Sequence, residues 1–290
     1  MRIALFYNER AGSSPPATDL RDVIHQGGHS IVQAVNLHEN DRPAFDPSTD
    51  VVVAAGGDGT VSRAATLVAA TGLPLAILPV GTANNIAKSL GIEGTIPELV
   101  AGWRRSAPVP VDMGRVEWNG GVLTFLESVG GGLVPAAIRA MQREPASPDE
   151  QPDEEVNRAV RRYREVLRTL TPQRWTLTMD GVWMEDELLL FEVLNMASVG
   201  PNLTFSPDTS ATDGLLSLVV AGERQRKDLE ALLDAQADGH APPRPLPVVH
   251  ARQIVIEGTD AIHIDDQVHL ANGSRRISVG ISPGVLTLLR

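Results

Sequence analysis

The sequence predicts two domains, a three-layer α/β domain followed by a mostly antiparallel β-sandwich domain. In the first hundred residues, continuous apolar runs alternate with helical segments, as in a parallel sheet covered by helices on both faces. Beyond residue 110 the apolar runs are short and are separated by turn dipeptides, which is typical of antiparallel strands. We therefore expect an α/β domain over residues 1–110, completed by 281–290, and a β-sandwich domain over 111–280.

The first domain is expected to alternate strands with helices. The apolar runs 1–7, 51–55 and 75–78 predict strands buried on both faces of a sheet. Residues 61–70 are rich in alanine and predict a helix that ends near Gly72. Residues 83–90 predict a second, shorter helix closed by Gly91.

The second domain is expected to contain two hairpins and several further strands. Asn119-Gly120 lies between the strand-like runs 111–118 and 122–129, and Asp180-Gly181 lies between 175–179 and 182–190. A helix is expected to begin near Asp153, and loops are expected at 142–155 and 239–247 because proline is frequent there. The remaining strand candidates are 191–199, 215–220, 253–257, 262–264 and 276–279.

Composition excludes several classes of function. The chain has no cysteine, so disulfides, thiolate nucleophiles and cysteine-ligated metals are excluded. A formal net charge of −11 argues against a nucleic-acid partner and against broad adhesion to anionic lipid. No apolar run approaches the roughly 18–20 residues that a membrane span requires. We therefore expect a cytoplasmic protein whose contact with a membrane surface, the inner one, is local and transient.

A glycine-rich segment, Gly56-Gly57-Asp58-Gly59-Thr60, follows a predicted buried strand and leads into a predicted helix. Such a turn presents main-chain N–H groups at a helix N-terminus, where they favour phosphate. Asp58 is expected to reach Mg²⁺ or a water on Mg²⁺, and Thr60 to cap the helix and donate to phosphate. The alternative is a tight strand–helix turn without a ligand.

A second loop with the same design occupies residues 79–85 after the next predicted strand. Thr82 could donate to phosphate, and Asn84 or Asn85 could cap the helix or hold a ligand. Because parallel strands end at the same edge of a sheet, we expect the two loops to be neighbours at that edge.

Five segments together resemble the diacylglycerol kinase catalytic family, which includes sphingosine and ceramide kinases and related bacterial lipid kinases. The resemblance covers nearly the whole chain, and the segments stand in the family's order and spacing. They are residues 8–12 (Asn-Glu-Arg-Ala-Gly), 56–60, 79–91, 111–114 (Val-Asp-Met-Gly) and 206–215.

The resemblance implies a two-domain lipid kinase that binds ATP and Mg²⁺ and transfers the γ-phosphoryl group to a hydroxyl of diacylglycerol or a related amphipathic lipid. It implies that Asp213 and the main-chain oxygens of Ser210 and Leu215 hold a structural Mg²⁺, although Asp213-Gly214 alone is typical of a turn before a strand. The oligomeric state stays open, a homodimer included. The residues implied to contact the nucleotide are Asn8, Asn36, Gly56, Gly57, Asp58, Gly59, Thr60, Val61, Ser62, Thr82 and Asn85.

The sequence departs from the family pattern at the phosphoryl-acceptor segment. The family has Asp-Gly-Glu where this chain has Asp265-Asp266-Gln267, and Asn85 replaces a family aspartate. Gln267 cannot act as a general base. Either Asp265 or Asp266 could orient the alcohol and accept its proton. We favour Asp265, because strand alternation would place it on the same face as Gln267; the alternative is a plain hairpin turn.

The acceptor segment and the glycine loop also allow an interpretation of His263 and two alternative functions. His263 has no identifiable partner and is interpreted as strand packing. The loss of two carboxylates, at Gln267 and Asn85, leaves open a nucleotide- or lipid-binding homologue with weak or no turnover. An NAD kinase or phosphofructokinase also has a Gly-Gly-Asp-Gly element, but the segments around Thr82 and Asp213 follow the lipid kinase pattern.

Overall fold

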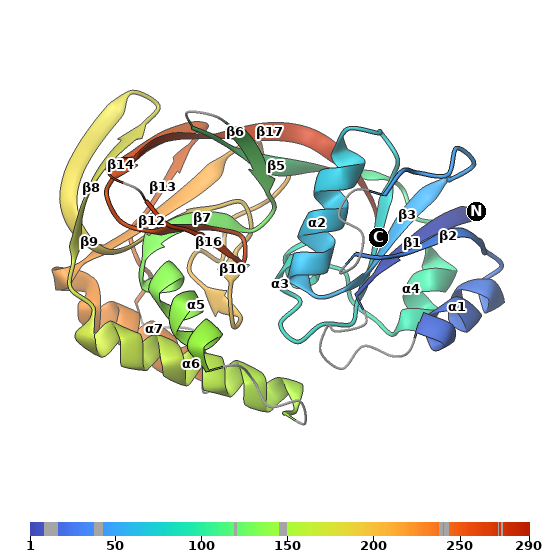
Figure 1. Cartoon of the computed structure of the whole chain (residues 1–290), viewed down its shortest axis with the longest axis horizontal. Coiled ribbons are helices and arrows are strands. Elements are labelled where there is room, and N and C mark those ends of the chain that lie inside the picture. Colours follow the sequence, from blue (N-terminus) through green and yellow to red (C-terminus); the bar gives the residue numbers. More distant parts are fainter. Residues whose placement is uncertain are drawn as a thin grey trace. The chain divides into compact units, whose positions relative to one another are not determined.

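The chain forms two compact units, one of Met1–Asp112 with Pro283–Arg290 and the other of Met113–Ser282. The computed structural model describes residues 1–8, 17–37, 43–118, 121–144, 150–237, 240, 244–271, 273 and 275–290. Figure 1 labels most of the helices and strands of both units. The first unit is α/β and the second is mostly antiparallel β, so the predicted fold class is confirmed.

The first unit contains a parallel sheet in the order β2-β1-β3-β4-β17. Its strands are β1 (Arg2–Tyr7), β2 (Ser30–Asn36), β3 (Val51–Gly56), β4 (Leu75–Pro79) and the end of β17 (Arg275–Leu289). All six residues of β3 are buried, as expected for an apolar run covered on both faces. The predicted strands are confirmed, and β2, which has a mixed pattern of burial, was not predicted.

Helices cover both faces of this sheet. The connections β1–α1–β2 and β3–α2–β4 run in opposite directions along the sheet, so right-handed crossovers place α1 and α2 on opposite faces (Figure 1). Glycines with positive φ, Gly72 (73°) and Gly91 (66°), follow α2 and α3 as predicted. The helices are α1 (Ala17–Gln26), α2 (Asp58–Ala69), α3 (Asn85–Ser89) and α4 (Ile96–Gly102).

In the second unit the central strand is β9 (Val182–Leu194). Its first half pairs with β8 (Gln173–Met179), and its second half lies between β7 (Ser128–Gly132) and β12 (Leu216–Gly222). The sheet continues in both directions, as β7-β15-β16 and as β8-β14-β17, with β13 beside β12 and β6 beside β5. The other bounds are β5 (Val109–Trp118), β6 (Gly121–Phe125), β10 (Ser198–Val199), β11 (Leu203–Thr204), β13 (Val248–Ala251), β14 (Gln253–Gly258), β15 (Ile262–Ile264) and β16 (Gln267–His269).

The predicted Asp180-Gly181 hairpin is confirmed between β8 and β9. Both turn residues have positive φ, 44° and 90°, which is the backbone that favours Asp-Gly in a two-residue turn. Asn119-Gly120 lies outside the described residues, but its flanking strands β5 and β6 pair antiparallel down to Trp118 and Gly121.

Two strand predictions in this unit are wrong. The expected strand 122–129 is interrupted at Leu126 and Glu127, and the expected break between 190 and 191 is absent because β9 is continuous to Leu194. The main-chain N–H groups of Asn195 and Met196, just beyond the end of β9, donate to the Glu127 carbonyl in this interruption (2.9 and 3.2 Å).

Helices α5 (Leu133–Arg143), α6 (Pro152–Thr169) and α7 (Arg226–Ala237), with the 3₁₀ turn η1 (Glu223–Gln225), complete the second unit. Helix α6 begins one residue before the predicted start, whereas α5 and α7 were not predicted. The expected loop 142–155 is shortened by α5 and α6. Residues 145–149, and residues 238–239 and 241–243 of the other expected loop, lie outside the described residues. Within the described chain no helix is both long and apolar enough to cross a membrane.

Candidate functional site

Four polar or glycine-rich chain segments meet at one edge of the parallel sheet in the first unit. Asn8 follows β1, Asn36 ends β2, Gly56 ends β3 and Pro79 ends β4. Because these strands are parallel, all four positions lie at their carboxyl ends, where open α/β sheets bind ligands. The rest of the first family-like segment, residues 9–12, lies outside the described residues.

The turn from β3 into α2 leaves donors at the start of the helix. Helix α2 begins at Asp58, and Gly57 is its N-cap residue. The N–H groups of Thr60 and Val61 both donate to the Gly57 carbonyl (3.0 Å), so those of Asp58 and Gly59 are the first-turn donors that lack an intrahelical acceptor. The prediction that Thr60 caps the helix is wrong.

The side chain of Thr60 instead explains why position 56 is glycine. A Cβ atom on Gly56 would lie 2.5 Å from the Cβ atom of Thr60. Thr60 is buried, and so are Val61 and Ser62 in the same turn. The side chains of these three predicted nucleotide contacts therefore offer little surface to a ligand.

The two glycine-containing loops touch through their backbones. The Val80 N–H donates to the Gly56 carbonyl (3.2 Å). A Cβ atom on Gly81 would lie 2.2 Å from the Gly57 Cα atom, so no other residue fits at position 81 without displacing the loops. The predicted adjacency of the loops is thus confirmed.

Asp58 joins the first loop to the helix that follows the second. Its Oδ1 atom accepts a hydrogen bond from the Ile86 N–H (2.9 Å) in the first turn of α3. Burial raises the pKa of Asp58, although the N–H groups of Ile86, Asn85 and Asn84 and the charge of Lys88 act in the opposite direction. One carboxylate oxygen is therefore used inside the protein, a contact that was not predicted. The role of Asp58 toward Mg²⁺ stays a prediction.

Asn84 closes the second loop on itself. Its Nδ2 donates to the Gly81 carbonyl (2.8 Å), its Oδ1 accepts from the Gly81 N–H (3.0 Å), and its backbone is left-handed with φ 53°. The Asn84 side chain makes no capping bond to α3, so its predicted capping role is taken by Asp58. Asn85 is 1% exposed, whereas Thr82 is half-buried in the loop.

We expect Asp58→Ala to lower the free energy of unfolding by about 0.5–2 kcal/mol, the usual effect of removing a helix cap. Asp58→Asn should cost less, because the amide oxygen can still accept from Ile86. Urea unfolding of the whole chain measures both, with Asp22→Ala on an exposed position of α1 as the matched control. If Asp58→Ala unfolds at the same urea concentration as the wild type, the contact contributes nothing to stability.

In the second unit the predicted acceptor segment is a hairpin turn. Asp265 and Asp266 link β15 to β16, and Ile264 pairs with Gln267 across the turn. Asp265 has a left-handed backbone with φ 48°. Alternation along a strand therefore does not apply here, and the reason for preferring Asp265 over Asp266 as the base is wrong.

The Asp265 carboxylate is held by the main chain of residues 126–128. Oδ1 accepts from the N–H groups of Glu127 (2.9 Å) and Ser128 (3.3 Å), and Oδ2 accepts from that of Leu126 (3.2 Å). These three bonds fix the position of the Asp265 carboxylate in the turn. Asp266 and Gln267, in contrast, are exposed.

His263 has a partner that the sequence did not reveal. Its Nε2 atom lies 3.0 Å from both carboxylate oxygens of Glu192, and its Nδ1 atom lies 2.8 Å from the Asp265 carbonyl oxygen. His263 is 1% exposed and Glu192 is 0% exposed. Burial lowers the pKa of His263, but the charge and hydrogen bond of Glu192 and the Asp265 carbonyl outweigh it, so the pKa is raised. Interpreting His263 as simple strand packing is wrong.

Both ring nitrogens of His263 lie within hydrogen-bond distance of oxygen atoms, and an imidazolium, with an N–H at each nitrogen, can donate to both. Two neighbours are compatible with the buried pair, because one has no side chain and the other has a neutral one. A Cβ atom on Gly130 would lie 2.1 Å from Glu192 Oε1. The buried hydroxyl of Tyr163 has no hydrogen-bond partner among the described residues, and burial followed by the charges of Glu192 and Glu127 raises its pKa, so it stays neutral.

We expect Glu192→Gln to lower the free energy of unfolding by on the order of 3 kcal/mol at pH 6, because it breaks a buried ion pair. The raised pKa of His263 contributes stability that is fully present below its ordinary value of 6.5 and is lost as pH rises through the folded value. The difference from wild type should therefore shrink at pH 9. Urea unfolding at both pH values tests this.

Glu257→Gln is the matched control, because Glu257 pairs with Arg276 at the surface of the same unit. We expect it to change the unfolding free energy by less than about 1 kcal/mol at either pH. A Glu192→Gln effect that grows from pH 6 to pH 9 would contradict the charged state assigned to His263.

The predicted Mg²⁺ loop has the geometry of a turn. Asp213 is exposed, its Oδ1 accepts from the Leu215 N–H (2.9 Å), and the hydroxyls of Ser210 and Thr212 lie 3.0 Å apart. No group of three or more His, Cys, Asp or Glu side chains is arranged around a metal position in the part of the chain described. A carboxylate with main-chain oxygens is nevertheless a donor set that suits Mg²⁺.

Comparison with known proteins identifies the family. Residues 2–116 match the model of the diacylglycerol kinase catalytic domain, and residues 138–290 match that of the YegS C-terminal NAD kinase beta sandwich-like domain. A diacylglycerol kinase of Bacillus subtilis is 30% identical over 241 residues, 76% of this chain and 73% of that protein. The chain therefore belongs to the diacylglycerol kinase catalytic family, as the five sequence segments suggested.

Two further relatives define the extent of the similarity. A diacylglycerol kinase of Mycobacterium tuberculosis is 28% identical over 192 residues, which cover 64% of this chain and 59% of that protein. A crystal structure of a diacylglycerol kinase from Bacillus anthracis superimposes with a TM-score of 0.72 at 22% identity, covering 99% of this chain and 96% of that one. The latter likeness shows the shared fold.

Proposed function

We propose that this chain is an ATP-dependent lipid kinase that transfers the γ-phosphoryl group to a hydroxyl of diacylglycerol or a related amphipathic lipid. The observation that carries the proposal is the pair of glycine loops in backbone contact at the carboxyl edge of the parallel sheet. The N-terminus of α2 lies at the same edge and presents main-chain donors suited to phosphate. Membership of the diacylglycerol kinase catalytic family supports the choice of a lipid acceptor.

The first unit would bind the nucleotide. The Asp58 and Gly59 N–H groups would contact the phosphates, with Asn8, Asn36 and Thr82 from the neighbouring strand ends completing the site. Mg²⁺, when bound with ATP, offsets the charge that develops on the transferred phosphoryl group. Asp213 with the main-chain oxygens of Ser210 and Leu215 would hold a second, structural Mg²⁺.

The second unit would handle the acceptor alcohol. Asp266 is the exposed carboxylate of the β15–β16 turn, so we assign to it the orientation of the hydroxyl and the acceptance of its proton. Asp265 anchors the turn through its three main-chain bonds. The Gln267 amide can donate to or accept from the lipid, but it cannot take the proton.

A second function is favoured by the absence of the family's carboxylates at Asn85 and Gln267 together with the anchored state of Asp265. These features suit a homologue that binds nucleotide and lipid with weak or no turnover. The two functions differ in the chemical step and not in nucleotide binding, so the experiments must measure both.

Incubation of the whole chain with Mg-ATP and a panel of diacylglycerol, monoacylglycerol, ceramide and a sphingoid base should give a phosphorylated lipid. Mass spectrometry of the lipid fraction detects the product, and calorimetry with a non-hydrolysable ATP analogue measures nucleotide binding separately. Nucleotide binding without a lipid product supports the second function. Absence of nucleotide binding, or phosphorylation of NAD alone, contradicts both.

In an active preparation, Asp266→Asn should lower kcat by about 100-fold or more while leaving the urea midpoint unchanged, because the side chain is exposed. Asp265→Asn should lower the urea midpoint, because an amide cannot accept all three main-chain bonds in the same geometry. The assignment is reversed if Asp266→Asn keeps wild-type kcat while Asp265→Asn keeps wild-type stability and loses turnover.

A further inference from the structure

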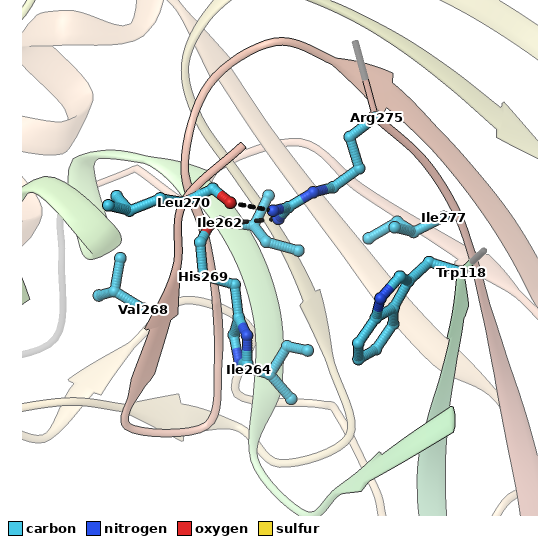
Figure 2. Close-up of a pocket in the computed structure, with 8 residues that line it drawn as sticks. All are labelled: Trp118, Ile262, Ile264, Val268, His269, Leu270, Arg275 and Ile277. Carbon is cyan, nitrogen blue, oxygen red and sulfur yellow. Dashed lines mark hydrogen bonds between the residues drawn. The ribbon is translucent and has the colours of Figure 1, made fainter. Parts of the chain in front are cut away.

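A pocket of about 290 Å³ lies in the second unit, beside the hairpin that carries Asp265 and Asp266 (Figure 2). Strands β5, β15, β16 and β17 contribute to its walls. None of the lining residues carries a carboxylate, and only two of them, His269 and Arg275, carry ionisable groups. The apolar part of the lining consists of Trp118, Ile262, Ile264, Val268, Leu270 and Ile277.

Arg275 is a cation without an anionic partner among the described residues. Its Nη1 and Nη2 atoms donate to the carbonyl oxygens of His269 (3.2 Å) and Leu270, which are neutral acceptors. A guanidinium has five N–H donors, so donors remain for a ligand. The Arg275 side chain is half-buried, and this burial lowers its pKa. The next residue, Arg276, is instead exposed and paired with Glu257.

His269 supplies a second polar group to the pocket. Its Nε2 atom is buried and has no hydrogen-bond partner within the described part of the chain. Burial, and then the charges of Arg275 and His263, lower the pKa of His269, so the ring is neutral near pH 7. In Figure 2 the Arg275 side chain lies at one end of the group of lining residues, and the Trp118 and His269 rings lie at the other.

The two carbonyl bonds of Arg275 have a simpler explanation, which is that the side chain ties down the segment after β16. That explanation accounts for the bonds but not for the placement of an unneutralised charge over an apolar pocket. A cation in such surroundings favours an anion that can pair with it in a planar, two-point geometry. Lysine at position 275 would keep the charge but lose the planar two-point geometry. It therefore tests the contribution of the charge separately from that of the geometry.

We propose that this pocket binds the carboxylate end of a medium-chain fatty acid, with the carboxylate on Arg275 and the hydrocarbon chain against the apolar lining. A volume of about 290 Å³ equals roughly ten water volumes, which suits a ligand of about ten non-hydrogen atoms. Octanoate has this size. A carboxylate carries one negative charge and matches one arginine, whereas a phosphate monoester would bring up to two charges to the same single cation. The proposal does not depend on kinase activity.

The test is calorimetry of the whole chain with octanoate and with 1-octanol, which share the hydrocarbon chain and differ in the head group. We expect octanoate to bind about tenfold more tightly than octanol to the wild type. Arg275→Gln should remove this difference, and Arg275→Lys should keep part of it because the charge remains. Arg276→Gln is the matched control, since it removes the neighbouring charge outside the pocket and should keep the full difference.

Fluorescence locates the ligand. Octanoate should change the tryptophan emission of the wild type, and Trp118→Phe should remove that change, because Trp118 lines the pocket. Equal affinity for octanoate and octanol, an unchanged preference in Arg275→Gln, or an emission change that survives Trp118→Phe would each overturn the proposal. If Arg275→Gln unfolds, a reduced preference in Arg275→Lys with the full preference kept in Arg276→Gln supports the two-point contact at position 275, and an unchanged preference in Arg275→Lys overturns it.

Discussion

Carboxylates that accept main-chain N–H groups organise the candidate site in both units. Asp265 accepts three such bonds from residues 126–128, and these bonds hold the turn between β15 and β16 against the turn between β6 and β7. In the first unit Asp58 accepts from the start of α3 and thereby ties one glycine loop to the helix after the other. Buried N–H groups must be paired. Removing either carboxylate would leave main-chain N–H groups of another segment without an acceptor and so lower the stability of the fold.

Strands β1, β3 and β4 of the parallel sheet were predictable because most of their residues are buried. A strand such as β3, buried along its whole length, needs an apolar residue at every position, and the sequence at 51–55 satisfies this requirement. The Asp180-Gly181 hairpin was predictable for an equally local reason, because both residues must adopt positive φ. An element whose residues must all meet one local requirement, such as burial or a positive φ, can be recognised from its own short stretch of sequence.

The interruption at Leu126 and Glu127 left no such pattern. Its cause includes the carboxylate of Asp265, which lies 137 to 139 residues away along the chain. The same is true of Glu192 and His263, which are 71 residues apart and pair only in the fold. The signal available in the sequence was the glutamate itself. A carboxylate within the apolar run 188–194 must be paired when it is buried, although nothing local identifies the partner.

The glycine loops show where prediction of a site stops. The glycines and the flanking strands predicted where the loops lie, that they are adjacent and that a helix follows each. They did not predict which residue caps which helix. Thr60 and Asn84 carry the side chains that usually cap helices, yet Thr60 packs under Gly56 and Asn84 closes its own loop. Capping of α3 is done by a residue of the neighbouring loop, and that neighbour is determined by the order of the strands.

The same contact gives a physical reason for the amide at position 85, where the family pattern has an aspartate. The Asn85 N–H is one of the groups that stabilise the Asp58 carboxylate, and the Asn85 side chain is buried. Burial already raises the pKa of Asp58, so a second carboxylate at this position would raise it further by repulsion. Asparagine keeps the size of the side chain without the charge. The substitution therefore favours an ionised Asp58, which is the state that the predicted role toward Mg²⁺ requires.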